Sequence, residues 1–358
     1  MEPVRPDYGG AWIGGIVPAL SHGETPAWLP APVKEARGIL LLVLDGLGWQ
    51  LVSKHAEHLP TLRAMAGGPI TSVVPSTTAA ALTSISTGTP PSEHGLVGYR
   101  IRVGGESLNV LRWESRAGPD PAVVQPIPPF MGRDVPVVTR TEFRHSGFSE
   151  AHLRNSTLIG WRTPSALVEH CRRLATDRHP LVYGYYDGID KIAHEYGLHN
   201  GFLTMELAAA DRLVADLLGV LPADWALLVT ADHGQVHVEE EDVIGLHAVD
   251  GLVAGYSGEG RFRTLHARAG ASRELTAACE EIYGGRAWVF TRDRLFDEGW
   301  MGQSATFAVR GRVGDVVLAA RDDVVFLDPD VPMERMMRSH HGSLTEAEML
   351  VPLLAERG

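Results

Sequence analysis

The stretch that most restricts the fold is the apolar run at residues 39–44, which ends at Asp45. The run shows no alternation of polar and apolar residues, a pattern typical of a strand covered on both faces in a parallel sheet. Ligands of open α/β sheets gather outside the carboxyl ends of the strands. Asp45, followed by Gly46 and Gly48, is therefore a candidate site residue, unless it only caps the next helix.

A second candidate site lies a short distance along the chain. Residues 70–74 predict another short strand, and residues 78–87 predict a helix of small side chains whose first turn carries Ser76, Thr77 and Thr78. Backbone N–H groups at a helix N-terminus stabilise an anion, and a hydroxyl placed there can attack phosphorus or bind a metal. The alternative is that these residues are ordinary N-caps.

The middle of the chain alternates between strands and helices. A helix begins at residue 164, with Thr163 as its N-cap, and is followed by a strand at 180–186. A helix with apolar residues along one face over 203–218 leads to another buried strand at 225–230. This alternation is the signature of βαβ units, and it predicts an α/β fold with a parallel sheet.

Two segments lack such periodicity. Residues 1–37 are rich in Pro and Gly, and we expect them to wrap the surface. Residues 118–160 are also irregular, and long irregular segments inside an enzyme-sized domain usually line or cover a site.

Composition limits the partners and the compartment. The net charge of −12 argues against non-specific nucleic-acid binding, but it does not exclude a small anionic substrate in a metal-filled pocket. The two cysteines, Cys171 and Cys279, form no CxxC pattern, which fits a reducing compartment. We see neither a signal-peptide pattern nor an apolar run of the ~20 residues that a membrane span requires, so the expected location is cytoplasmic.

Carboxylate and imidazole side chains follow the predicted strands. Asp190 and His194 are four residues apart, so one helical turn places them on the same side at metal-ligand separation. Asp232 and His233 follow the strand at 225–230, and His341 precedes a glycine near the C-terminus. Each His taken singly is more often a core or surface residue, but three Asp and three His at strand or loop ends are hard to explain in that way.

Taken together, these residues resemble the alkaline phosphatase superfamily, and within it the type I phosphodiesterase/nucleotide pyrophosphatase family, over residues 38–354. The motifs are Asp45 after its strand, PSTTAAALTSISTG with Thr78, DxxxH at Asp190, TADHG at Asp232, and HG at His341. The resemblance implies one catalytic domain over residues 1–358, with an alkaline-phosphatase-like, mostly parallel central sheet flanked by helices. It also implies a small inserted cap subdomain at residues 245–330.

The resemblance further implies two divalent metal ions, normally Zn²⁺, and a small phosphate-ester substrate. By motif position, one ion would be held by Asp190, His194 and His341, and the other by Asp45, Asp232, His233 and Thr78. His340 is a poorer candidate, because the family ligand directly precedes the glycine. Thr78 aligns with the nucleophile, so its attack on phosphorus would give a phosphothreonine that water then hydrolyses.

Two positions depart from the family pattern. Members that act on nucleotides usually carry an aromatic residue after the nucleophile, where this chain has Ala79, and a phosphoryl-binding Asn aligns with Tyr99. Tyr99 is accordingly the candidate substrate-binding residue. The absence of Lys and Arg between Thr78 and Thr87 favours a diester over a monoester dianion.

We therefore predict hydrolysis of phosphodiester or phosphoanhydride bonds. The alternatives within the superfamily are a phosphomonoesterase and a phosphonate hydrolase. The alternative from another class is a non-catalytic, metal- or phosphate-binding pseudoenzyme. A sulfatase is disfavoured because the Cys or Ser in a CxPxR context that becomes formylglycine is missing around Thr78. A relative of cofactor-independent phosphoglycerate mutase would use Ser as its nucleophile, which this stretch lacks in register.

Overall fold

The computed structural model describes residues 2–177 and 179–358, which are built around a seven-stranded sheet of order β2-β17-β8-β1-β7-β5-β6. Neighbouring strands from β8 to β6 pair in parallel, whereas β17 runs antiparallel to both β8 and β2. The strands are β1 (Gly38–Leu44), β2 (Ala66–Thr71), β5 (Val137–Arg140), β6 (Leu158–Trp161), β7 (Leu181–Tyr186), β8 (Trp225–Thr230) and β17 (Leu350–Arg357). The prediction of a mostly parallel α/β sheet is confirmed.

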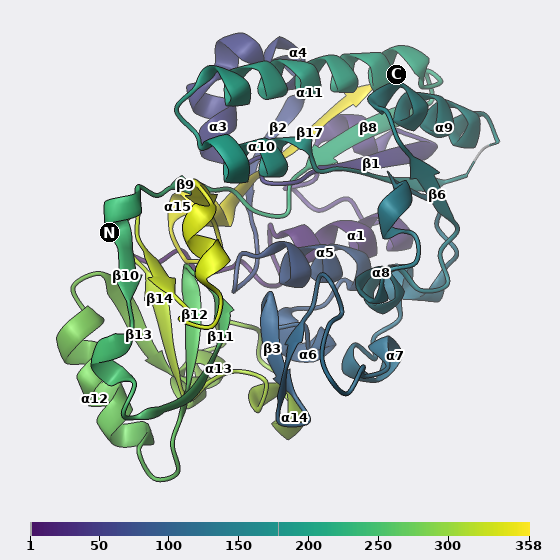
Figure 1. Ribbon diagram of the computed structural model, residues 1–358. Helices are drawn as coiled ribbons and strands as arrows, with labels where there is room; N and C mark the ends of the chain where they lie inside the picture. Colours follow the sequence, from purple (N-terminus) through teal and green to yellow (C-terminus); the bar gives the residue numbers. More distant parts are fainter. Residues whose placement is uncertain (1, 178) are drawn as a thin grey trace.

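Strand β1 occupies the middle of the sheet because every one of its residues is apolar or glycine, and all of them are buried. Helices α9 (Pro164–Thr176) and α11 (Gly201–Val220) lie over one face of the sheet, and α1 (Ile16–His22), α5 (Thr78–Thr87) and α8 (Gly147–Leu153) lie on the other (Figure 1). Helix α9 begins as predicted, with the Thr163 hydroxyl accepting a hydrogen bond from the Ala166 N–H. Helix α5 is buried along its whole length, which its small side chains permit.

Two local predictions are wrong. The N-terminal segment does more than wrap the surface, because Ile13 and Ile16 are fully buried and join the main core. The strand expected at residues 70–74 is β2, which covers residues 66–71 instead. The chain leaves the sheet at Ser72, whose N–H donates to the Met349 carbonyl and whose hydroxyl donates to the Asp232 carbonyl.

A second, antiparallel sheet of order β11-β12-β14-β13 has its own apolar core beneath α12 (Ser272–Tyr283). Its strands are β11 (Val253–Glu259), β12 (Phe262–Ala267), β13 (Ala287–Thr291) and β14 (Val316–Ala320). A buried ion pair joins this sheet to the main one: Arg261 Nε and Nη2 lie 2.6 and 2.8 Å from the two carboxylate oxygens of Glu348, in α15 (Glu346–Met349). The sheet falls within residues 245–330, and its role as a cap stays a prediction.

Shorter elements complete the surroundings of the site. The hairpin of β3 (Arg100–Val103) and β4 (Glu106–Asn109) lies beside β11 (Figure 1). Strand β16 (Ser339–His340) pairs with β9 (Val236–His237), and β10 (Val243–Gly245) pairs with β15 (Val325–Leu327). Helix α3 (Trp49–Lys54) follows β1, and α10 (Gly188–Tyr196) follows β7.

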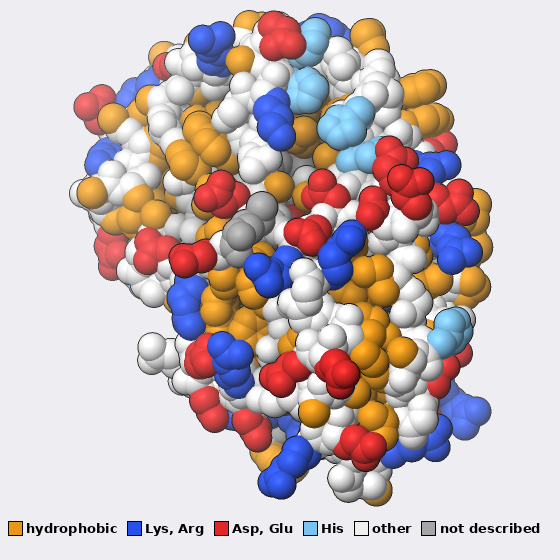
Figure 2. Space-filling model, turned by 90° about the vertical axis from the view of Figure 1, so that its left-hand side faces the viewer, with side chains coloured by type: hydrophobic (Ala, Val, Ile, Leu, Met, Phe, Trp, Pro, Cys, Tyr) orange, Lys and Arg blue, Asp and Glu red, His pale blue; other side chains and the backbone are white. Residues whose placement is uncertain are grey.

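The surface carries charges of both signs. On the face drawn in Figure 2, Lys and Arg side chains are interspersed with Asp and Glu rather than gathered into one basic region. Among residues 2–177 and 179–358, none of the helices combines the length and hydropathy needed to cross a bilayer.

Candidate active site

Three neighbouring strands deliver polar residues to one edge of the main sheet. Asp45 directly follows β1, Asp232 lies just beyond the end of β8, and β7 leads into helix α10, which carries Asp190. Asp45 does not cap the next helix, because the N-cap of α3 is Gly48. The order β8-β1-β7 explains why residues far apart in sequence meet at this edge.

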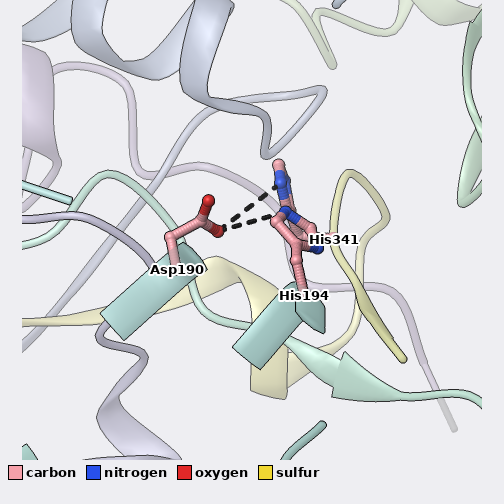
Figure 3. Close-up of side chains that lie close together, drawn as sticks. All are labelled: Asp190, His194 and His341. Atoms are coloured by element: carbon pink, nitrogen blue, oxygen red, sulfur yellow. Dashed lines mark ion pairs between the residues drawn. The ribbon is translucent and has the colours of Figure 1, made fainter. Parts of the chain in front are cut away.

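The first group of candidate ligands is Asp190, His194 and His341, whose ligand atoms all lie within 4.8 Å of one another. Asp190 and His194 project from successive turns of α10, and His341 approaches from the loop after β16 (Figure 3). Asp190 Oδ1 lies 3.3 Å from His194 Nε2 and 4.0 Å from His341 Nε2. These side chains are partly exposed, so the group is open to a small molecule.

The second group is Asp45, Asp232 and His233, which also meets the 4.8 Å limit and is buried. His233 Nε2 lies 3.5 Å from Asp45 Oδ1, 3.3 Å from Asp232 Oδ2, and 3.1 Å from the hydroxyl oxygen of Thr78. The two groups adjoin, because the rings of His233 and His341 stack with their centroids 3.6 Å apart. All seven residues named from the sequence as metal ligands or nucleophile therefore come together.

All three imidazoles are oriented in the same way. Their Nδ1 atoms lie 2.7 Å from the Ser339 carbonyl for His194, 3.1 Å from the Gly234 carbonyl for His233, and 3.0 Å from the Ser76 carbonyl for His341. A carbonyl only accepts, so each Nδ1 carries the proton and each Nε2 presents a lone pair. In every case that lone pair faces the carboxylates, which is how a metal-binding imidazole is held.

The three carboxylates are also held in place by hydrogen bonds, which they accept. Gln235 Nε2 donates to Asp190 Oδ1 at 2.9 Å, the Gly46 N–H donates to Asp232 Oδ1 at 3.1 Å, and the Tyr185 hydroxyl donates to Asp45 Oδ2. One buried oxygen of Asp45 and one of Asp232 have no hydrogen-bond partner among the described residues. Buried acceptors without a donor are rare, so these atoms fit the binding of a cation.

The electrostatics of the site also fit a cation. Burial raises the pKa of Asp190 and Asp232, and burial together with the charges of Asp232 and Asp190 raises the pKa of Asp45 well above its usual range. Burial lowers the pKa of His233 and, with the neighbouring imidazoles, lowers that of His341 further. Crowded carboxylates and neutral imidazoles are stabilised by a divalent ion, and this mixed set of oxygen and nitrogen donors suits zinc.

Thr78 is the first residue of helix α5 and is 8% exposed. Because the Nδ1 of His233 carries a proton, the Thr78 hydroxyl donates to His233 Nε2. Thr77 occupies the N-cap, yet within the described part of the chain its side chain accepts no hydrogen bond from the helix. The first N–H groups of α5 are thus left to face an anion beside Thr78.

Two cavities meet at Thr78. The larger, of ≈ 630 Å³, which we call the main cavity, is lined by polar and apolar residues that include Thr78, Tyr99, Arg100, Asn109, Arg112, Asp190, His194, Glu259, Met333 and His341. The smaller, of ≈ 100 Å³, which we call the apolar cavity, is lined mainly by Leu82, Leu111, Phe143, Phe148, Tyr183 and Tyr185, with Thr78 and several smaller polar residues. Tyr99 thus lies at the main cavity, where its hydroxyl accepts a hydrogen bond of 2.8 Å from Asn109 Nδ2.

Sequence reasoning missed several residues at this site. Gln235 and Tyr185 hold ligand carboxylates, and Asn109 and Glu259 line the main cavity. Local signals existed at Gln235, which directly follows the TADHG motif, and at Glu259, a single carboxylate between Gly258 and Gly260. The other positions depend on packing between distant segments.

The fold and the site define a phosphate-processing α/β protein of the alkaline phosphatase superfamily. A family model for type I phosphodiesterase / nucleotide pyrophosphatase matches residues 39–344, so the chain belongs to this family. Membership indicates a hydrolase of phosphoester type. A sequence search of curated proteins finds no match.

Solved structures share the fold. Murine ectonucleotide pyrophosphatase / phosphodiesterase 5 superposes with a TM-score of 0.69 at 16% identity, covering 89% of this chain and 88% of its own. A second structure of that murine protein is described as an inactive Thr-to-Ala variant in complex with AMP. Phosphonoacetate hydrolase from Sinorhizobium meliloti 1021, with phosphonoformate bound, has a TM-score of 0.64 at 19% identity, covering 90% of this chain and 91% of its own.

Proposed function

We propose that this protein hydrolyses phosphodiester or phosphoanhydride bonds of a small substrate through a covalent intermediate on Thr78. The observation that carries the proposal is the meeting of two candidate ligand groups beside the Thr78 hydroxyl. A hydroxyl alone is a weak nucleophile, and the surrounding groups supply what it lacks.

The residues fit two divalent ions, for which zinc is our choice. Asp190, His194 and His341 would hold one ion, and Asp45, Asp232, His233 and Thr78 would hold the other. When bound, the ions would lower the proton affinity of the Thr78 hydroxyl and neutralise the leaving oxygen.

The reaction that we propose consists of two displacements at phosphorus. Thr78 Oγ1 forms a bond to phosphorus while the bond from phosphorus to the leaving oxygen breaks; the hydroxyl proton is lost to solvent, and the leaving oxygen takes up a proton and departs as the alcohol or phosphate. Free N–H groups at the start of α5 stabilise the charge on the phosphoryl oxygens. Water then attacks phosphorus from the side opposite Thr78, the bond from phosphorus to Oγ1 breaks, and Oγ1 takes up a proton while the water gives one up.

The surroundings of Thr78 favour a diester. A diester presents a second organic group, and the apolar cavity with Phe143, Phe148 and Tyr185 offers that group an aromatic wall. The extra charge of a monoester would need a free cation at the phosphoryl group. Arg100 in the main cavity is paired with Asp328 at 2.9 Å and does not supply one.

A phosphonate substrate is the second candidate. It is favoured by the shared fold with phosphonoacetate hydrolase and by the exposed Arg112 at the main cavity, which could face a substrate carboxylate. For the compartment we keep the cytoplasm as our proposal, because Cys171 and Cys279 are both buried free thiols.

The test is to compare kcat/KM of the zinc-loaded protein for 4-nitrophenyl phosphate, its methyl and phenyl diesters, and phosphonoacetate, with metal content measured on the same samples. We expect the diesters to be preferred. A strong monoester preference would overturn the ester class, and phosphonoacetate as the best substrate would establish the second candidate. Absence of turnover on the whole panel, despite bound metal, would favour the pseudoenzyme.

A further inference from the structure

Glu259 stands at the turn between β11 and β12, where the second sheet reaches the main cavity. It is 8% exposed. Its Oε2 accepts a hydrogen bond of 2.9 Å from the Tyr99 N–H, which fixes the side chain. Its Oε1 is buried and has no hydrogen-bond partner within residues 2–177 and 179–358.

The backbone around Glu259 leaves room for its side chain. A Cβ on Gly342 would lie 2.7 Å from Glu259 Cγ, and a Cβ on Gly98 would lie 3.6 Å from Oε2. Gly342 directly follows His341, so the carboxyl group is brought next to the first ligand group. A side chain at position 342 would therefore displace Glu259 from this position.

The cations nearby do not satisfy Glu259. Arg100 pairs with Asp328 at 2.9 Å, and Arg263 pairs with Glu334. A buried polar atom without a partner costs stability, and in a cavity lining it marks a place where a ligand completes the hydrogen bonding.

We propose that Glu259 is a specificity-determining residue that hydrogen-bonds a hydroxyl on the organic group of the substrate. This inference rests on the proposed function, because the phosphoryl group must be held beside Thr78 for the organic group to reach the main cavity. A hydroxyl both donates and accepts, so it pairs with a carboxyl group in either protonation state. A purely apolar group would leave Oε1 unpaired, and sites built in this way reject such analogues.

The test uses zinc-loaded protein in a Thr78→Ala background, so that ligands are not turned over. Calorimetry would measure the Kd of methyl monoesters of unsubstituted alkylphosphonates, which carry one charge as a diester does, and of their ω-hydroxy and ω-amino counterparts at ethyl, propyl and butyl length. Glu259→Ala and Glu259→Gln are the test variants. Glu114→Gln changes an exposed carboxylate of the same cavity and is the matched control.

We expect one hydroxyalkylphosphonate to bind about 10-fold more tightly than its unsubstituted match. Glu259→Ala should abolish this preference, whereas Glu259→Gln and Glu114→Gln should keep most of it. Equal affinities at all three lengths, or a preference that survives in Glu259→Ala, would overturn the proposal. Tighter binding of the amino compounds would overturn the assignment of a hydroxyl and show that Glu259 recognises an ammonium group. If no phosphonate binds the zinc-loaded protein, the proposed function fails and this inference fails with it.

Discussion

Replacing Asp45 by Asn should raise the free energy of unfolding of the metal-free protein. It should also reduce the extra stability that bound metal supplies. Asp45 is 2% exposed, and its Oδ1 lies 3.5 Å from His233 Nε2. Without a cation, Asp45 Oδ1 has no hydrogen-bond partner among the described residues, and leaving a buried acceptor unpaired costs about 1–3 kcal/mol. In the variant, the Asn oxygen can keep the bond from Tyr185, and the neutral amide puts a donor in place of Oδ1 and removes a buried charge beside Asp232. Metal-free Asp45→Asn should therefore gain about 1–3 kcal/mol.

In the presence of zinc, the wild type should be more stable than Asp45→Asn. An ion that binds only the folded wild-type protein at 100 times its Kd adds about 2.7 kcal/mol, and a neutral amide ligand should forfeit most of this. Urea unfolding in chelator and in zinc measures both effects. Asp211→Asn is the control: Asp211 is buried away from the site and accepts from the N–H groups of Thr61 and Leu62 at 3.1 and 2.9 Å, so the variant should lose stability equally in both conditions. Equal stabilisation of wild type and Asp45→Asn by zinc would refute the reasoning.

Three further predictions concern single residues. Thr78→Ala should lower kcat/KM on the order of 10⁴-fold at unchanged metal content, and full activity in this variant would contradict the nucleophile assignment. Gln235→Ala frees the Asp190 carboxylate and should weaken zinc affinity about 10–100-fold, as measured by chelator competition. Burial lowers the pKa of His94 to about 3, so the folded state resists protonation and stability falls with pH below 6.5. Between pH 6 and 4 the free energy of unfolding of the wild type should therefore fall by about 1.4 kcal/mol per pH unit more than that of His94→Gln, as measured by urea unfolding. Equal pH dependence in the two proteins would show that His94 does not cause the loss of stability in acid.

The sequence predicts well those strands whose burial follows from their own residues. Strand β1 is a continuous apolar run, and so is β8 up to Val229; such runs are typical of strands buried on both faces. Strand β2 reads AGGPIT and carries no such pattern. It exists because its backbone pairs with β17 at the far end of the chain, and local sequence contains no information about that pairing.

The same distinction applies to the site. Asp45 and Asp232 follow buried strands, so their common edge can be deduced from the parallel topology. Glu259 reaches the cavity only because the turn between β11 and β12 packs between Gly98 and Gly342, two segments distant in sequence. Its place depends on how two sheets meet, and the spacing of residues along the chain does not encode that.

His341 connects the parts of the site more closely than its position near the end of the chain suggests. Its Nε2 faces Asp190 of the first group, while its ring stacks on His233 of the second with an interplanar angle of 10°. Its Nδ1–H donates to the carbonyl of Ser76, two residues before Thr78, and the Ser76 N–H donates in turn to the Gly342 carbonyl at 3.1 Å. One imidazole thus contacts Asp190 of the first group, His233 of the second and the backbone that carries the nucleophile. A shift of the loop after β16 must therefore move the two ligand groups and the segment of Thr78 together.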